Sequence, residues 1–230
     1  MQYRLQWPLQ LAISPAALES HEQIFELLLQ LRRARWALET LESVPTGTAD
    51  APTAAPAQPA SERRDGQRGP WRWCAHPWRV LRAEILHVIA AIYAHLTLGV
   101  INPEWQAFEA AMQNDLATSV DTFRSAHEAF AKRVAERCLL APPDAPVRHA
   151  IEAILGLALR LRMQLRDLPR LNVRVHATSA AKWRQELRRA VVFVLGQLRL
   201  AASRDARTEL LDLCRLLDFN GFYHNQGGTI

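Results

Sequence analysis

Apolar residues recur at steps of three and four along most of this 230-residue chain, a spacing typical of amphipathic helices. The clearest stripe after residue 70 comprises Trp78, Leu81, Ile85, Ile89, Ile92 and Leu96. Two later stripes comprise Val147, Ile151, Ile154, Ala158, Leu161 and Leu165, and Trp183, Leu187, Val191, Val194 and Leu198. Together these stripes predict an all-α bundle of about seven helices with short connections.

The first 44 residues predict a short extended segment followed by a long helix. Polar or small residues and Pro8 separate the apolar residues Leu5, Trp7, Leu9, Leu11 and Ile13, an alternation that favours extended chain. Ser14 and Pro15 then predict a helix start, with the serine hydroxyl as N-cap and proline at the first helical position. This helix is expected to reach about Glu42, with an apolar face of Leu18, Phe25, Leu28, Leu29, Trp36 and Leu41.

Residues 45–70 differ in composition from the rest of the chain. They include no Leu, Ile, Val, Met, Cys or aromatic residue, and 14 of the 26 positions are Pro, Gly or Ala. Such a segment cannot bury enough apolar area to offset its chain entropy, so a disordered linker is expected. A proline-rich docking peptide is the alternative, although the motif from Pro56 to Pro59 lacks basic and aromatic anchors. The linker divides one helical domain into residues 1–44 and 71–230.

Capping patterns predict further helix starts along the chain. They lie at Asn102-Pro103, before Trp105, Phe108 and Met112; at Thr118 with Asp121; at Ser179; and at Asp205, before Leu210, Leu213 and Leu217. The helix after Thr118 carries the stripe Val120, Phe123, His127, Phe130, Val134 and Cys138. The prolines from Pro142 to Pro146 are expected to end this helix and begin the next.

Positive charge is concentrated in the last third of the chain. The net charge is +5 overall, about −2 over residues 1–146 and +7 over residues 147–230. Only Lys132 and Lys182 are lysines, and arginine favours planar contacts with carboxylate or phosphate groups. An acidic protein or nucleic acid is therefore a possible partner class, and a solvated arginine face without function is the alternative.

The sequence predicts no enzyme, no cofactor and no metal site. It contains no nucleotide-binding, hydrolase or zincin motif, since His21-Glu22 and His127-Glu128 both lack a second histidine one turn on. His87 and His95 are two helical turns apart, which is too far to share a metal ion unaided. His127 lies in an apolar stripe with no evident partner, so we expect a buried histidine of the core.

Neither a disulfide framework nor a membrane span is expected. The three cysteines, Cys74, Cys138 and Cys214, are far apart and show no C-x-x-C spacing. The longest apolar stretch, from Ala83 to Ile101, is interrupted by Glu84, His87 and His95, and the amino terminus does not read as a signal peptide.

Four blocks of sequence resemble the gamma-tubulin complex components. One family block has an extended stretch with Trp-Pro-Leu, here Trp7-Pro8-Leu9, followed by a helix whose end matches residues Leu28 to Arg33. The segment from Trp78 to Trp105 resembles the next block. Residues 125–140 (SAHEAFAKRVAERCLL) are similar to a third block, and residues 216–229 (LLDFNGFYHNQGGT) to the terminal one. The Gly-Gly-Thr near the end looks most like component four.

The resemblance implies a scaffold rather than a catalyst. Family members hold gamma-tubulin with a carboxy-terminal helical domain, and they pack against sister components to build a ring that templates microtubules. This chain resembles the latter part of that domain, as a fragment, a truncated gene model or a shortened relative would. Gamma-tubulin and other components are the implied partners, with no membrane and no nucleic acid. The implied location is the cytoplasm and cytoskeleton, at a microtubule organizing center or spindle pole.

Four residues are predicted to bind the partner. Arg184 and Arg188 are one helical turn apart, so they project from the same face, while Trp183 and Leu187 turn toward the core. Asn220 and Tyr223 lie in the turn-rich carboxy-terminal block, where Phe219, Phe222 and Tyr223 are expected to pin the terminus onto the bundle. The alternative function is a basic helical nucleic-acid-binding protein that uses the same arginines on phosphates.

Overall fold

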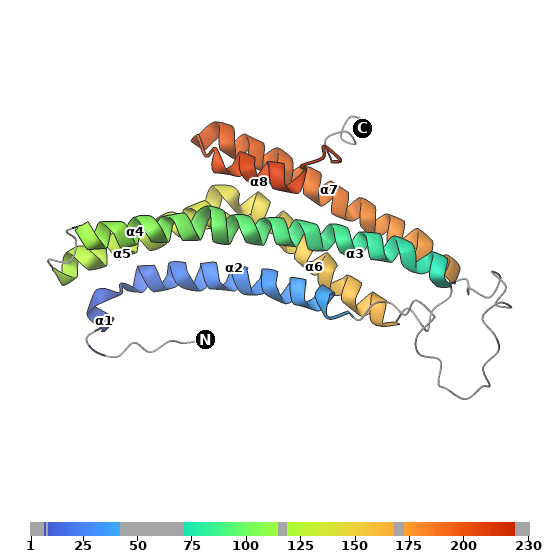
Figure 1. The fold of residues 1–230 in the computed structure, drawn as a ribbon, viewed down its shortest axis with the longest axis horizontal. Helices are drawn as coiled ribbons and strands as arrows, with labels where there is room; N and C mark the ends of the chain where they lie inside the picture. Colours follow the sequence, from blue (N-terminus) through green and yellow to red (C-terminus); the bar gives the residue numbers. More distant parts are fainter. Residues whose placement is uncertain (1–6, 8, 42–70, 115–118, 168–172, 224–230) are drawn as a thin grey trace, which may run out of the picture.

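The computed structural model describes residue 7 and residues 9–41, 71–114, 119–167 and 173–223, and over these residues it is all-α, as predicted. Figure 1 shows an elongated bundle with α7 and α8 along one edge and α2 along the opposite edge. The helices are α1 (Leu9–Ala12), α2 (Pro15–Glu39), α3 (Trp71–Ala94), α4 (Asn102–Asn114), α5 (Val120–Ala135), α6 (Ala145–Asp167), α7 (Val173–Asp205) and α8 (Glu209–Leu217). The predicted linker, residues 45–70, lies outside the described residues.

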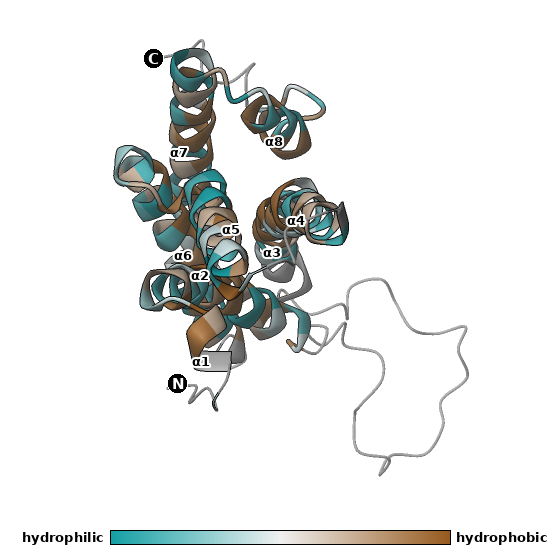
Figure 2. Cartoon of the chain, turned by 90° about the vertical axis from the view of Figure 1, so that its left-hand side faces the viewer, coloured by the Kyte–Doolittle hydropathy of each residue, from teal (hydrophilic) through white to brown (hydrophobic). Residues whose placement is uncertain are grey.

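One apolar core runs through the bundle. The predicted stripes of α3 and α6 are buried at every position, which confirms them. In α7 and α8 the stripe residues Leu187, Val191, Val194, Leu198, Leu210, Leu213 and Leu217 are buried as well. Helix α6 packs against both α2 and α7, and α3 packs against α2, α6, α7 and α8. Figure 2 shows the bundle turned by 90°, with hydrophobic (brown) and hydrophilic (teal) residues in every labelled helix of the bundle from α2 to α8.

Helix α2 begins as predicted but buries a different face. Ser14 is the N-cap, and its Oγ accepts a hydrogen bond from the backbone N–H of Ala17 at 3.1 Å. The buried residues are Ala17, Ile24, Leu27, Leu31, Ala34, Ala37 and Leu38, whereas Phe25, Leu29 and Trp36 are exposed. The predicted apolar face was therefore wrong at those three positions. The helix carries two apolar stripes, and the one with small alanines lies against its neighbours, because small side chains allow close helix approach.

The predicted extended segment is corrected where the structure describes it. Leu9–Ala12 form one helical turn, α1, and the preceding residues apart from Trp7 lie outside the described part. Alternation over a few positions cannot distinguish a strand from a single helical turn. Pro8 directly before α1 is also compatible with a helix start.

Asn102-Pro103 does not begin a separate helix. A π-helical segment, His95–Ile101, joins α3 to α4 without a break, and the backbone N–H of Asn102 donates to the carbonyl of Thr97. Pro103 has no N–H to donate, and the wider π turn lets the helix continue past it. The prediction failed because a proline that is tolerated inside such a turn has the same sequence pattern as one at a helix start.

Three further predicted caps are corrected. The N-cap of α5 is Ser119, whose Oγ accepts from the N–H of Thr122 at 3.1 Å, one residue after Thr118, which lies outside the described part. Ser179 lies inside α7, and Asp205 is the last residue of α7, where it pairs with Arg204. Because serine and aspartate occur both at caps and on solvated helix faces, their presence alone did not locate the ends.

The proline cluster separates two helices as predicted. A π segment, Glu136–Leu140, contains Leu139 in the left-handed region at φ 64°, and a 3-10 turn, Pro142–Asp144, leads into α6. Leu139 is fully buried, so core packing holds this strained residue in place.

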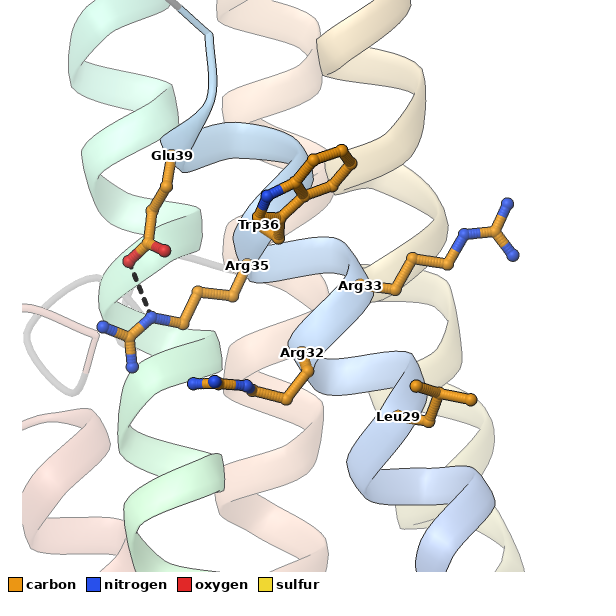
Figure 3. Close-up of a pocket in the computed structure, with 6 residues that line it drawn as sticks. All are labelled: Leu29, Arg32, Arg33, Arg35, Trp36 and Glu39. Carbon is orange, nitrogen blue, oxygen red and sulfur yellow. Dashed lines mark hydrogen bonds and ion pairs between the residues drawn. The ribbon is translucent and has the colours of Figure 1, made fainter.

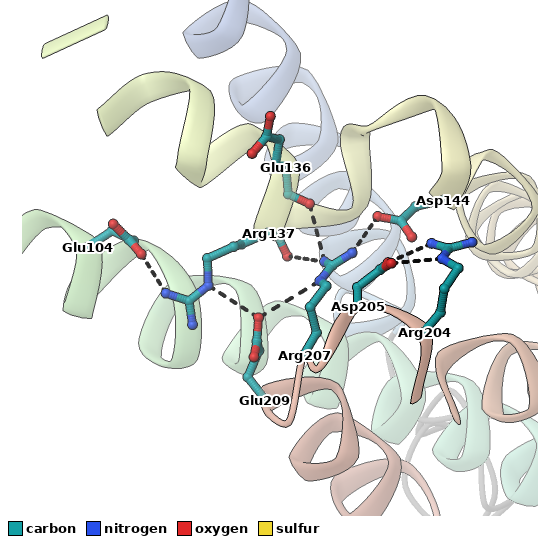
Figure 4. Close-up of polar contacts among 8 residues, drawn as sticks. All are labelled: Glu104, Glu136, Arg137, Asp144, Arg204, Asp205, Arg207 and Glu209. Atoms are coloured by element: carbon teal, nitrogen blue, oxygen red, sulfur yellow. Dashed lines mark hydrogen bonds and ion pairs between the residues drawn. The ribbon is translucent and has the colours of Figure 1, made fainter. Parts of the chain in front are cut away.

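A network of ion pairs joins residues 136–144, which connect α5 to α6, to α4 and α8 (Figure 4). Arg137 contacts Glu104 at 2.5 Å and Glu209 at 3.3 Å, and Arg207 contacts the buried carboxylate of Asp144 at 2.8 Å. Arg207 also donates to the backbone carbonyl of Glu136 at 3.2 Å. Burial would raise the pKa of Glu104, but hydrogen bonds from Arg137 and Arg133 outweigh it and lower that pKa. The network joins elements far apart in sequence around the π segment.

The continuous helix from His76 to Gln113 is long and apolar enough to cross a membrane by length and composition alone. In the structure its apolar residues, including Trp78, Ile85 and Ile92, form the centre of the core. The core helix of a soluble protein passes the same length and composition test, so the test by itself is weak evidence for a membrane span.

Candidate partner-binding site

The structure brings the four predicted site residues together at one corner. Arg184 and Arg188 lie on α7, and Asn220 and Tyr223 lie in the turn that follows α8. This C-terminal corner, defined as Glu84, Arg184, Arg188 and residues 218–223, lies where α3, α7 and the terminal turn meet. The contribution of α3 to this corner was not predicted from the sequence.

Arg184 forms an ion pair with Glu84 of α3. Its Nε donates to both carboxylate oxygens, at 2.8 and 2.9 Å, and its Nη2 donates to Oε1 as well. The Glu84 side chain is 17% exposed and that of Arg184 36%. The hydrogen bonds that Arg184 donates to Glu84 raise the pKa of Arg184 above its usual value. Arg184 is therefore part of the contact between α7 and α3.

Arg188 and the terminal turn pack against each other. The Arg188 guanidinium lies over the Phe222 ring, with 4.9 Å from Cζ to the centroid, and Phe222 meets Tyr223 edge-on at 5.1 Å. Phe222 is half-buried and Tyr223 is buried, whereas Phe219 is 81% exposed. Pinning by Phe222 and Tyr223 agrees with the structure, and the prediction that Phe219 also pins the terminus was wrong.

Hydrogen bonds between residues close in sequence give the terminal turn its shape. The Oδ1 of Asn220 accepts from the N–H of Phe222 at 3.2 Å, and the Oδ1 of Asp218 accepts from the N–H of Tyr223 at 2.8 Å. Gly221 has φ 67°, a conformation that favours glycine. Burial, followed by the nearby charge of Glu84, raises the pKa of Tyr223 to about 12. Asn220 thus shapes the turn, and Tyr223 anchors it as a neutral phenol.

The outward face of α7 combines basic and apolar side chains. Arg189, Phe193 and Leu200 follow one another at steps of four and seven, so they lie on one side of the helix, and all three are exposed. Leu187 on the opposite side is buried, and Trp183 packs edge-on against Trp78 at 5.4 Å, as predicted. Exposed apolar groups in a row beside arginine are typical of protein interaction surfaces.

Residues 1–223 match the model of one protein family, described as gamma tubulin complex component C-terminal. The chain belongs to this family. Among curated relatives, gamma-tubulin complex component 5 of Mus musculus is 25% identical over 164 residues, which cover 69% of this chain and 16% of that protein. Gamma-tubulin complex component 6 of Mus musculus is 25% identical over 166 residues, covering 72% of this chain and 8% of its own length.

The comparisons confirm the family that the sequence blocks resembled. The chain spans less than a quarter of the length of these gamma-tubulin complex components. The relatives named here are components 5 and 6, and the closer likeness to component four stays a prediction.

Two residues that contribute to this site, Glu84 and Phe193, were not identified from the sequence. Glu84 is one of few carboxylates in a long apolar helix, and such an isolated charge signals a partner on a neighbouring helix. Phe193 lies within the apolar run from Val191 to Leu195, which covers more of the α7 circumference than one buried face requires. Both signals are weak before the packing is known.

Away from the C-terminal corner, His21 and His127 form a pair. His127 does have a partner, which corrects the sequence reading: its Nε2 lies 3.3 Å from Nε2 of His21. Burial lowers the pKa of both histidines, and the charge of His21 lowers that of His127 further. Burial raises the pKa of Cys138 to about 12, which leaves its thiol unreactive. Among the described residues, no group of three possible metal ligands comes together.

Proposed function

We propose that this chain is a non-catalytic scaffold that binds gamma-tubulin and, with other gamma-tubulin complex components, supports microtubule nucleation. The observation that carries the proposal is the match of residues 1–223 to the family's carboxy-terminal region. The corresponding location is the cytoplasmic cytoskeleton, at microtubule organizing centers or spindle poles. The fold supports a binding role, because the outward side of α7 presents exposed apolar and basic side chains to solvent.

The contact face in this proposal is the outward side of α7 beside the C-terminal corner. Arg189 and Arg199 supply exposed positive charge there, and Phe193 and Leu200 supply exposed apolar area. An acidic protein surface with apolar patches is complementary to this combination. The net charge of +7 over residues 147–230 adds long-range attraction, which salt weakens.

The four predicted site residues act at the border of this face. Arg184 and Tyr223 hold α7, α3 and the terminal turn in register through the Glu84 pair and burial. Arg188 and Asn220 fix the position of Phe222. In this proposal they position the contact surface, and their partly exposed atoms border the bound protein.

The nucleic-acid alternative gains less support from the packing. Three basic residues that it would use on phosphates already have partners within the chain. Arg160 pairs with Glu186 at 2.5 Å, Arg184 pairs with Glu84, and Arg188 stacks on Phe222. Phosphate contacts from these arginines would have to replace existing contacts, which favours the scaffold function over this alternative.

Binding of the purified chain to gamma-tubulin at two ionic strengths tests the proposal. The double variant Arg189→Glu/Phe193→Ser should weaken binding at least tenfold and flatten the salt dependence. Arg124→Glu on α5 makes the same charge change at another exposed position and should leave affinity within about twofold. Absence of binding by the wild-type chain would contradict the function. Equal losses in the double variant and the control would contradict the α7 face.

A further inference from the structure

Helix α2 carries a second apolar stripe that faces away from the bundle. Phe25, Leu29 and Trp36 are 58%, 54% and 58% exposed, and the partly exposed Leu18 lies on the same line. Successive spacings of seven, four and seven residues place these four side chains on one helix face. A continuous row of large exposed apolar groups marks an interaction surface, whereas scattered ones do not.

Two exposed charges complete the outer seam of α2, which we define as Leu18, Glu22, Phe25, Leu29, Arg32 and Trp36. The steps of four, three, four, three and four are those of a helix-pairing seam. Read from either end, the seam has the order apolar, charged, apolar, apolar, charged, apolar. The two charged positions carry opposite signs, so the seam is complementary to itself when reversed.

We propose that the outer seam binds the outer seam of a second copy of this chain, with the two α2 helices antiparallel. In this register Leu18 faces Trp36, Glu22 faces Arg32 and Phe25 faces Leu29 of the second copy. Two-fold symmetry makes each of these pairs occur twice. A parallel arrangement would instead place Glu22 against Glu22 and Arg32 against Arg32, so charge selects the antiparallel direction.

The local structure has room for this contact at the Trp36 end. A hollow of about 460 Å³ is lined by Leu29, Arg32, Arg33, Arg35, Trp36 and Glu39. Figure 3 shows Leu29 and Trp36 on one side of the helix, with the Arg32 side chain turned from the edge of the seam toward the other side, where its guanidinium lies over the Tyr93 ring of α3. To meet Glu22 of the second copy, the long Arg32 side chain leaves this ring and turns back to the seam. The Arg162 guanidinium of α6 lies over the Trp36 ring, with 5.0 Å from Cζ to the centroid, and restrains the indole. In the dimer Leu18 of the second copy packs at this hollow.

The size of the seam sets the expected affinity. From Leu18 to Trp36 it extends about 27 Å along the helix axis. A helix pair of that length buries on the order of 1,000 Å² in total, at the low end for specific interfaces. We therefore expect a reversible dimer with a Kd of roughly 1 to 100 µM. Helix α2 lies at the opposite edge from α7 (Figure 1), so dimerisation leaves the α7 face open.

Sedimentation equilibrium of the full chain at micromolar concentrations tests the dimer. The wild-type chain should show a monomer–dimer equilibrium, and Leu29→Glu, at the centre of the seam, should raise Kd at least tenfold. Leu200→Glu is the matched control, because Leu200 is 64% exposed on α7, and it should change Kd by less than about twofold. A monomer at all concentrations, or a dimer indifferent to Leu29→Glu, would overturn the proposal.

Charge reversal tests the antiparallel register. Glu22→Arg and Arg32→Glu should each weaken the dimer, because each creates two like-charge contacts. An equimolar mixture of the two variants should associate as tightly as wild type, since both cross-pairs are then opposite in sign. The Arg32 guanidinium lies 5.7 Å from the centroid of the Tyr93 ring, so melting curves must show that each variant is folded. A mixture that associates no better than the separate folded variants would rule out this register, whatever the outcome with gamma-tubulin.

Discussion

Arg184 of α7 and Glu84 of α3, 100 residues apart in sequence, form an ion pair at the C-terminal corner in which Arg184 donates to both carboxylate oxygens. Glu84 is the more buried partner, so its carboxylate depends on Arg184 for compensation of its charge. Replacing Arg184 by glutamate would place two carboxylates against each other here and so disturb the fold. The pair thus makes Arg184 a residue of the fold as well as of the candidate site.

Replacing Arg184 by methionine should lower the free energy of unfolding by about 2 kcal/mol. This value lies between those for exposed ion pairs and those for buried pairs that lose one partner, because Glu84 retains some contact with water. Urea unfolding at pH 7 measures the change. Arg189→Met, on the exposed side of the same helix, should stay within about 0.5 kcal/mol of wild type. Equal stabilities for the two variants would contradict the role assigned to the pair.

Phe222 and Phe219 should differ sharply when replaced by alanine. Phe222 is half-buried beneath Arg188 and beside Tyr223, so its loss should cost about 1 to 3 kcal/mol, less than for a fully buried phenylalanine. Phe219 is 81% exposed, so its loss should change stability by less than about 0.5 kcal/mol. Thermal unfolding of both variants makes the comparison. A larger effect at Phe219 would mean that the terminal turn is packed differently.

The His21–His127 pair should make the fold less stable in acid. Burial lowers both pKa values below the unfolded value of 6.5, so the native state resists protonation. The stabilisation is complete above pH 6.5 and is lost as the pH falls through the lowered native values. Each unit of lowering corresponds to about 1.4 kcal/mol. The free energy of unfolding, measured by urea titration from pH 7 to pH 5, should therefore decrease.

The variant His127→Gln separates this pair from other acid-sensitive groups. It removes one imidazole and leaves His21 without a histidine neighbour, so the fall in stability between pH 7 and pH 5 should be smaller. His87→Gln, at an exposed position of α3, should retain the wild-type pH dependence. If all three proteins lose stability in parallel, the histidine pair does not account for the acid sensitivity.

Sequence reasoning was most successful where one stripe of a helix was strongly apolar. Helices α3 and α6 are strongly apolar on one side only, so burial of that side could be predicted. The buried residues include Ile85, Ile89 and Ile92 in α3 and Ile151 and Ile154 in α6. Helix ends were less predictable. The cap of α5 depends on a side-chain hydrogen bond that serine or threonine can make at several neighbouring positions. The π segment between α3 and α4 is closed by a backbone hydrogen bond from Asn102 to Thr97, which no side-chain pattern announces.

The helical class, the main core stripes and the family could be predicted from the sequence, because periodicity and local blocks are properties of neighbouring residues. Which of the two apolar stripes of α2 is buried depends on tertiary packing, since both stripes satisfy the same helical period. Tertiary packing also decides that Arg184 meets Glu84 and that His127 meets His21, 106 residues away. Such pairings arise from how the helices pack against one another, and helical spacing within one segment carries no information about them.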